Sequence, residues 1–229
     1  MSSYRYIIYQ CLNLDCRFRF PARQDWPITK GCPKCGAIIQ AVEMEHPAQR
    51  VKVLDNSANG PTVEALLDNI RSCFNVGSMF RAADGSGLSH IHLCGLSPTP
   101  DNPKVSKTAL GAEISVPWTQ HLDGLTAVNL LKQRSYRIWG LEGGPRSQSL
   151  FSLGRLLAGS PILLVVGNEV SGIDPGILDL CDRVISIPME GFKRSLNVAV
   201  AFGIAAYFLR FGIQIGQSWA SVDLGEPGG

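Results

Sequence analysis

The 229 residues are 45% hydrophobic and 17% charged, which is typical of globular proteins with a sizeable core and excludes a disordered or fibrous chain. The longest apolar run, residues 198–209, is too short to span a bilayer, and residues 1–10 contain no apolar signal segment. We therefore expect a cytoplasmic protein with reduced cysteines and no membrane partner. Residues 1–50 hold seven basic and four acidic side chains, a net charge of +3, so the positive excess belongs to the N-terminal fifth.

Four of the seven cysteines lie in this N-terminal part, as the pairs Cys11 and Cys16, and Cys32 and Cys35. Four thiolates close a tetrahedral zinc site, and the second pair lies in a Cys-Pro-x-Cys-Gly turn. With short strands expected at residues 4–10 and 37–44, we predict a zinc ribbon over residues 1–47 whose zinc is structural. Unrelated buried cysteines or a redox pair are the alternatives, but no βαβ pattern follows the second pair.

Aromatic residues are interleaved with the basic side chains of this module. This combination suits an RNA backbone with exposed bases. A second interpretation, given equal weight, is that the aromatic residues form the core of a small module. The two interpretations are compatible. Residues 48–61 are predicted to be a linker.

From residue 62 the sequence alternates between apolar strands and helices. Strands are expected at residues 62–67, 91–94, 137–141, 161–167 and 181–187, and helices at 75–85, 106–110, 122–132, 149–157, 175–179 and 198–207. Residues 98–105 contain three prolines and predict a loop, and residues 218–229 a flexible tail. Almost continuously apolar strands indicate an α/β fold with a parallel sheet covered by helices on both faces.

Three polar clusters interrupt this pattern, at residues 68–81, at 167–173 (GNEVSGI) and at 187–201 (IPMEGFKRSLNVAVA). Ser195 occupies an N-cap position before the last helix, and Glu169 is placed to cap the turn that follows it. Asn75 and Arg81 are six residues apart and need not share a helix face unless Asn75 caps the helix. Loops at the carboxyl ends of strands are where open α/β sheets bind their ligands.

In order and spacing these clusters resemble the three motifs of the SpoU/TrmH-type methyltransferases of the SPOUT superfamily, over about residues 62–210. The resemblance implies a C-terminal trefoil knot and a methyltransferase domain over residues 62–217. It also implies a homodimer with its active site between subunits. The implied reaction is S-adenosylmethionine-dependent 2′-O-methylation of a ribose in a structured RNA, either tRNA or rRNA.

The resemblance also assigns roles to single residues. Cofactor binding falls to Gly167, Ile187, Met189, Ser195 and Leu196, and catalysis to Arg81, Asn75, Glu169, Ser195 and Asn197. Arg81 is expected to engage the 2′-hydroxyl, and because an arginine stays protonated it would stabilise the developing oxyanion or relay the proton through a phosphate of the RNA. Lys193 and Arg194 suit RNA phosphate or a solvated surface equally.

Two other functions compete with methyl transfer. The alternative is a non-catalytic RNA-binding or assembly protein that retains the fold, against which the intact Asn75 and Arg81 argue. A nucleotide-dependent α/β enzyme is disfavoured, because no phosphate-binding glycine loop follows the first strand. The four histidines, His46, His90, His92 and His121, lie outside the motifs and receive no role.

Overall fold

The computed structural model describes residues 6–23, 25, 27–42, 61–153 and 159–212. The chain divides into two compact units, residues 1–55 and 56–229, and the division falls within the segment predicted to be a linker. None of the helices in the described part of the chain is long and apolar enough to cross a membrane.

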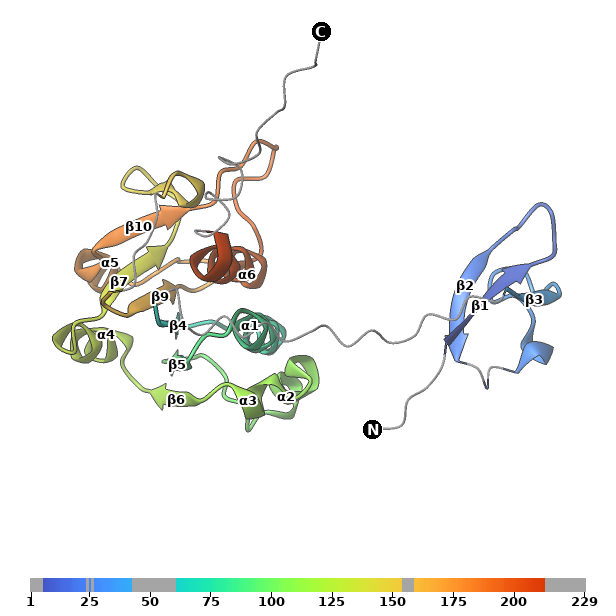
Figure 1. Cartoon of the computed structure of the whole chain (residues 1–229), viewed down its shortest axis with the longest axis horizontal. Coiled ribbons are helices and arrows are strands. Elements are labelled where there is room, and N and C mark those ends of the chain that lie inside the picture. Colours follow the sequence, from blue (N-terminus) through green and yellow to red (C-terminus); the bar gives the residue numbers. More distant parts are fainter. Residues whose placement is uncertain (1–5, 24, 26, 43–60, 154–158, 213–229) are drawn as a thin grey trace, which may run out of the picture. The chain divides into compact units, whose positions relative to one another are not determined.

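The first unit is a small antiparallel sheet with the strand order β2-β1-β3 (Figure 1). Its elements are β1 (Tyr6–Cys11), β2 (Arg19–Arg23), the 3₁₀ turn η1 (Ile28–Lys30) and β3 (Ile39–Val42). Strand β2 was not expected from the sequence. The core of this unit consists of Tyr9, Cys11, Ala22, Cys32 and Ile39, so cysteine side chains supply part of the packing that an apolar core supplies elsewhere.

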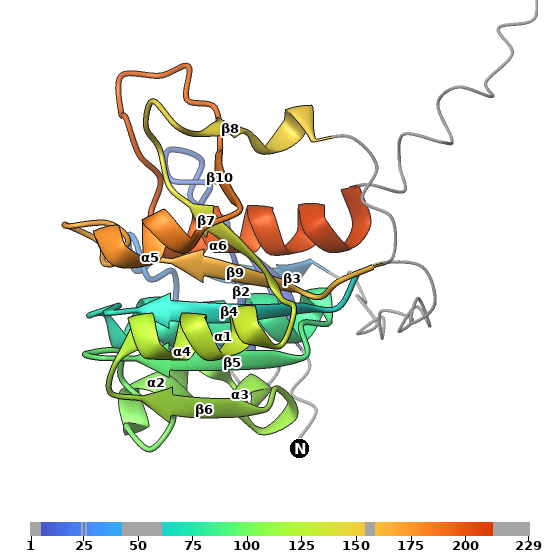
Figure 2. The same ribbon diagram turned by 90° about the vertical axis from the view of Figure 1, so that its left-hand side faces the viewer.

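The second unit is a seven-stranded sheet in the order β6-β5-β4-β9-β7-β10-β8, in which every pairing is parallel (Figure 2). The strands are β4 (Val63–Asp68), β5 (His90–Cys94), β6 (Trp118–His121), β7 (Arg137–Leu141), β8 (Gln148–Ser149), β9 (Ile162–Val166) and β10 (Arg183–Ser186). The predicted α/β fold with a parallel sheet is confirmed. The trefoil knot stays a prediction.

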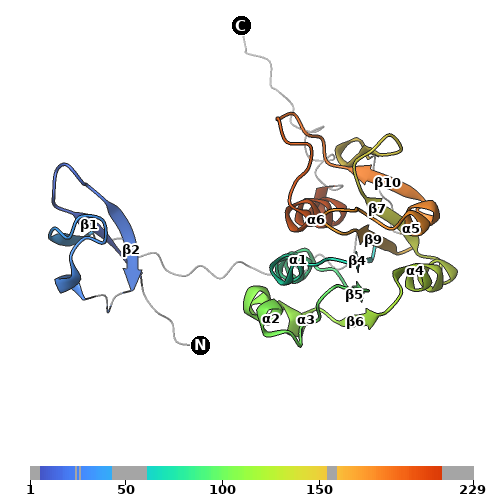
Figure 3. The same ribbon diagram turned by 180° about the vertical axis from the view of Figure 1, so that it is seen from behind.

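Helices cover both faces of this sheet (Figures 1 and 3). They are α1 (Cys73–Ser86), α2 (Pro103–Ala109), α3 (Ala112–Ser115), α4 (Gly124–Gln133), α5 (Pro175–Leu180) and α6 (Val198–Tyr207), with the short turns η2 (Leu150–Ser152) and η3 (Phe208–Gly212). In β4, Ala65 and Leu67 pack towards α1 and α6, whereas Leu66 packs towards α4 and α5. Both faces of the strand are buried, which is why its sequence is apolar without alternation.

Several elements of the second unit differ from the sequence-based expectation. Helix α2 begins at Pro103, inside the predicted loop, because proline is well accommodated in a first helical turn and Asn102 caps the helix by accepting from the Lys104 amide. Strand β6 and helix α3 were missed. The helix predicted over residues 149–157 is the turn η2 as far as the structure describes it, and residues 154–158 lie outside the described residues.

Candidate active site

Two of the three motif segments leave the sheet at its centre. The segment 68–81 follows β4 and the segment 167–173 follows β9, and these strands are neighbours (Figure 2). The chain leaves β4 towards β5 on one side and leaves β9 towards β10 on the other, so the strand order reverses between them. Such a switch point is where open parallel sheets place their ligands.

The Glu169 carboxylate ties these two segments together. It accepts hydrogen bonds from the amide of Arg71 at 3.0 Å, the amide of Ser72 at 3.2 Å and Nδ2 of Asn75 at 2.9 Å. Desolvation acts to raise the pKa of Glu169, but these bonds outweigh it, so the pKa lies below its usual value. Glu169 therefore holds the start of α1 as an ionised carboxylate. The turn that follows it is held instead by Asn168, which accepts from the Val170 amide at 2.9 Å.

Asn75 extends this contact to the third segment. Its Oδ1 accepts from Nδ2 of Asn197 at 3.1 Å, and Oδ1 of Asn197 caps α6 by accepting from the amides of Ala199 at 2.9 Å and Val200 at 3.4 Å. We call this set of contacts the Glu169–Asn75–Asn197 bridge. It joins three segments that are far apart in sequence.

The prediction that Ser195 caps the last helix is wrong, because Asn197 fills that position. Ser195 is exposed and makes no hydrogen bond with the residues that the structure describes. Asn75 does not cap α1 either. Ser72 does, by accepting from the Asn75 amide at 3.3 Å, which places Asn75 in the first turn with its side chain directed at both neighbouring segments.

Gly167 is the tightest point of the second segment. A Cβ atom at this position would lie 2.2 Å from the backbone of Gly172 and Ile173, because Asn168 and Gly172 exchange backbone hydrogen bonds of 3.0 and 2.9 Å. Only glycine fits such a close approach of two backbone segments. The backbone of Gly167 is thereby fixed at the end of β9.

Asn168 contributes to this site, although no role was predicted for it from the motifs. Its Nδ2 donates to the carbonyl of Asn69 at 2.7 Å and so joins the loop after β9 to the loop after β4. Asn69 adopts φ +57° and accepts at Oδ1 from the Leu96 amide at 3.1 Å. An asparagine directly after a glycine at a strand end was the available sequence signal.

The loop of the third segment has no protein cover within the described part of the second unit. Residues 188–197 are all exposed, and they include the apolar side chains of Met189, Phe192 and Leu196, which are 37%, 98% and 36% exposed. Ile187, at the start of the loop, packs partly against the core. Apolar side chains beside a fixed backbone turn provide a surface on which a flat organic group can bind.

Arg81 lies apart from the bridge. It is exposed, six residues beyond Asn75 on α1, which corresponds to about 9 Å along the helix axis. Its side chain forms no hydrogen bond or ion pair with the described residues. The structure thus brings Asn75, Glu169 and Asn197 together, and it leaves Arg81 and Ser195 outside their contacts.

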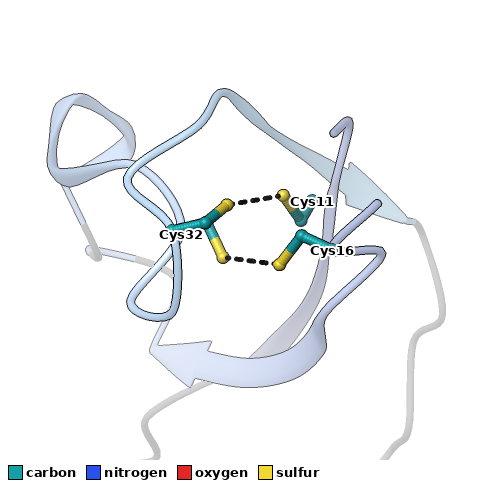
Figure 4. A group of neighbouring side chains, drawn as sticks. Cys11, Cys16 and Cys32 are labelled. Atoms are coloured by element: carbon teal, nitrogen blue, oxygen red, sulfur yellow. Dashed lines mark hydrogen bonds between the residues drawn. The ribbon is translucent and has the colours of Figure 1, made fainter. Parts of the chain in front are cut away.

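The first unit gathers its four cysteines into a second candidate site, made of Cys11, Cys16, Cys32 and Cys35. Their sulfur atoms all lie within 4.8 Å of one another. Figure 4 shows Cys11 and Cys16 facing Cys32; the Cys11–Cys35 and Cys16–Cys32 sulfur distances are 3.6 and 3.9 Å. Sulfurs around a tetrahedral zinc are about 3.8 Å apart, so these two distances match those of a four-thiolate zinc site.

Backbone amides support the second cysteine pair. The Gly36 amide donates to the Cys32 carbonyl at 2.8 Å in a tight turn, and Gly36 has φ +73°. Desolvation acts to raise the pKa of the Cys32 thiol, but the amides of Cys35 and Lys34 and the neighbouring thiols bring it down to about 7. Burial raises the pKa of Cys11 to about 12. All seven cysteines of the chain are free of disulfides.

Comparison with known proteins identifies the family of the second unit. Residues 62–207 match the model of the SpoU rRNA Methylase family, and the chain belongs to this family. It is 31% identical over 147 residues to the 23S rRNA (guanosine(2553)-2′-O)-methyltransferase RlmP of Bacillus subtilis, a match covering 63% of this chain and 56% of the relative. The chain spans 55–70% of the length of the curated relatives that it matches.

Solved structures agree with this assignment. The SpoU methyltransferase AviRb from Streptomyces viridochromogenes, solved with AdoMet, superposes with a TM-score of 0.61 at 25% identity, covering 79% of this chain and 70% of the other. A structure described as concerning 2-OH methylation of C/U34 on tRNA gives a TM-score of 0.58 at 28% identity, covering 68% of this chain and 98% of that one. The resemblance inferred from the motifs is confirmed at the level of the family.

Proposed function

We propose that this protein transfers a methyl group from S-adenosylmethionine to the 2′-hydroxyl of a ribose in rRNA or tRNA. The observation that carries the proposal is the Glu169–Asn75–Asn197 bridge, because it assembles polar residues of all three motif segments. The family membership and the RNA-methylating relatives support the reaction class.

The residues at the switch point fit the cofactor. Gly167 offers a backbone turn that no side chain crowds, and Met189 and Leu196 offer apolar side chains open to solvent. We assign cofactor binding to these three residues together with Ile187 and Ser195. When bound, S-adenosylmethionine supplies an electrophilic methyl group on a sulfonium centre.

Arg81 is the catalytic residue of the proposal. Its guanidinium has no partner among the described residues, so it is free to contact the ribose 2′-oxygen and to stabilise negative charge as the proton leaves. An arginine side chain does not act as a general base, so the proton is passed to another group, such as an RNA phosphate. The bridge residues hold the three loops in place, with Glu169 as the ionised anchor of α1.

The separation of Arg81 from the bridge supports a homodimer whose active site lies between subunits. In that arrangement the exposed loop 188–197 is covered by the second copy as well as by ligands. Methyl transfer requires a nucleophile aligned with the methyl carbon. Arg81 and the cofactor loop beside the bridge must therefore come together in the assembled enzyme.

For the first unit we propose a zinc ribbon over residues 1–47 that positions the RNA. The sulfur geometry supports structural zinc on Cys11, Cys16, Cys32 and Cys35. Phe18, 38% exposed, ends a stack of rings formed with Phe20 and the buried Tyr9, and two exposed arginines, Arg17 and Arg19, flank it in sequence. Stacking and positive charge are the means by which single-stranded RNA is held. Seven cysteines without a disulfide suit the cytoplasm, where we place the protein.

The test is calorimetry with S-adenosylhomocysteine, followed by radiolabelled methyl transfer to rRNA and tRNA. We expect Arg81→Ala to bind S-adenosylhomocysteine like the wild type, while methyl transfer falls about 10²–10³-fold because one group that stabilises charge is lost. Arg134→Ala, which removes an exposed arginine after α4, is the control and keeps full activity. If the folded wild-type protein binds no S-adenosylhomocysteine, the reaction is misassigned and the RNA-binding alternative stands. If Arg81→Ala retains full activity, only its catalytic role is wrong.

Removing residues 1–46 tests the role of the ribbon. We expect weaker RNA binding with unchanged S-adenosylhomocysteine affinity, since the cofactor residues all belong to the second unit. If the truncated protein keeps its circular dichroism spectrum but loses both RNA binding and S-adenosylhomocysteine binding, a modular role for the ribbon is contradicted.

A further inference from the structure

Three histidines that the motifs do not use lie together on β5 and β6. His90 and His92 of β5 and His121 of β6 each direct a ring nitrogen at Oγ1 of Thr119, with distances of 3.1 Å from His90 Nε2, 3.1 Å from His92 Nδ1 and 3.0 Å from His121 Nε2. Alternate residues of a strand share a face, so all four side chains lie on the face opposite α1. We call the three histidines the histidine cluster.

Two ring nitrogens of the cluster face each other directly. His92 Nδ1 and His121 Nε2 are 3.1 Å apart. Around a tetrahedral zinc with Zn–N bonds of about 2.0–2.1 Å, ligand nitrogens are about 3.3–3.4 Å apart. The two imidazoles are therefore close to the spacing of ligands that share one ion. His90 Nε2 reaches the same hydroxyl from β5, but only the four cysteines, among the described residues, form a group of three or more ligand atoms close enough to share one ion.

The Glu64 carboxylate orients His92 through Nε2, the ring nitrogen that does not face His121. Glu64 on β4 accepts from His92 Nε2 at 3.0 Å and from the Tyr136 hydroxyl at 2.8 Å. Desolvation acts to raise the pKa of Glu64, but these two bonds lower it overall, so Glu64 is ionised. Because Glu64 takes the proton of Nε2, the lone pair of His92 Nδ1 points towards His121. Metal-binding histidines are commonly held by a carboxylate in this way.

Solvent reaches this cluster. Thr119 is exposed and His90 and His121 are half-buried, whereas His92 is 8% exposed. Helix α4 on this face packs against α5 and β7, and in Figures 1 and 3 no helix lies over the edge strand β6 on that side. An ion can enter from solvent and keep water as a further ligand.

We propose that His92 Nδ1 and His121 Nε2 together bind one divalent transition-metal ion such as Zn²⁺ or Ni²⁺, with water completing its coordination. Imidazole nitrogens suit these ions, and the site is distinct from the four cysteines. The bound ion would join the edge strand β6 to β5 through side chains. The competing explanation is a set of hydrogen bonds in which Thr119 and the histidines satisfy one another. The proposal does not depend on methyl transfer.

The experiment is a calorimetric titration of the full-length protein with Ni²⁺, after one equivalent of Zn²⁺ has been supplied for the cysteines. A chromogenic chelator follows any release of that zinc. We expect one Ni²⁺ per chain without zinc release, and at least tenfold weaker binding in His121→Asn. His46→Asn, which removes the only histidine outside the cluster, is the matched control and binds Ni²⁺ like the wild type.

Glu64→Gln tests the orienting carboxylate without removing a ligand. Loss of such a partner costs about 10–100-fold in metal affinity, and we expect a decrease in that range. In wild type the unfolding temperature should rise with Ni²⁺, and in His121→Asn it should not, because only the folded state binds the ion. Absence of a Ni²⁺ site in folded wild-type protein, or equal affinity in wild type and His121→Asn, would overturn the proposal and leave the hydrogen-bond explanation.

Discussion

The two units of the chain place their functional residues in opposite relation to the core. In the first unit Cys11 and Cys32 are part of a core of five buried side chains, so the candidate metal site and the packing are the same residues. In the second unit two apolar layers fill both faces of the sheet, and Asn75, Glu169 and Asn197 lie outside them at the strand ends. Loss of a site residue should therefore unfold the first unit but only disable the second.

The largest expected effect is that of Cys32→Ser on the first unit. A structural zinc supplies about 10–16 kcal/mol of apparent binding free energy that is coupled to folding, and a lost thiolate removes most of it. Hydrogen exchange should show loss of amide protection in β1, β2 and β3, with β4 and β9 unchanged. Cys73→Ser, at a half-buried cysteine of α1 outside the cluster, should leave the first unit protected. Unchanged protection in Cys32→Ser would show that this unit folds without a metal.

Gly167→Ala should give the next largest effect. The added Cβ would lie 2.2 Å from the backbone after β9, so the loop must move. Overpacking of this kind costs about 1–3 kcal/mol, and we expect the affinity for S-adenosylhomocysteine to fall about tenfold or more. The control is Gly143→Ala, where nothing lies within 4 Å of the new atom. Equal affinities of the two variants would remove Gly167 from the cofactor site.

Asn197→Ala separates the capping role from the role in the bridge. Loss of the cap of α6 should lower the free energy of unfolding by about 1 kcal/mol. Asn102→Ala removes the equivalent cap of α2 at a similar cost. We expect methyl transfer to fall at least about tenfold in Asn197→Ala alone, because only this variant breaks the contact with Asn75. If both variants keep full activity, the bridge has no role in catalysis.

The smallest effect is the pH dependence that Glu169 contributes. Its folded-state pKa is depressed below the ordinary value of 4.5, so its stabilisation is fully present above that pH and is lost as pH falls through the folded pKa. Because Glu169 is exposed, solvent screening limits the contribution to less than about 1 kcal/mol. Urea denaturation should show wild type more stable than Glu169→Gln at neutral pH, with the difference shrinking in acid. A difference independent of pH would show that charge is not the cause.

The sequence predicts the centre of the fold better than its edge. Strand β7 has the bounds expected from its apolar run, residues 137–141, because a strand buried on both faces carries its signal in composition alone. Strand β6 lies at the sheet edge, where Thr119 and Gln120 are exposed, so it lacks a continuous apolar run. Helix α2 was concealed by the prolines after β5, since Pro103 starts a helix here.

For the site, the motifs predict which residues matter but not how they are connected. Glu169 was expected to cap its own turn, yet its partners Arg71 and Ser72 follow a different strand. That contact depends on β4 and β9 lying side by side, which is a property of the strand order. The spacing of residues within a motif does not predict which strands are neighbours in the sheet. The histidine cluster was missed for the same reason, because β5 and β6 meet only in the folded sheet.

The position of β4 between β5 and β9 also has a consequence for synthesis. Strand β9 is translated after β5, β6 and β7. Strand β4 therefore lacks β9, its second neighbour, while the ribosome adds residues 69–166. At about 5–20 residues per second this interval lasts about 5–20 seconds. During it, a strand that is apolar on both faces exposes one unpaired edge, and such edges pair readily with other chains. We therefore expect a chaperone that covers this edge to reduce aggregation of the nascent chain until β9 emerges.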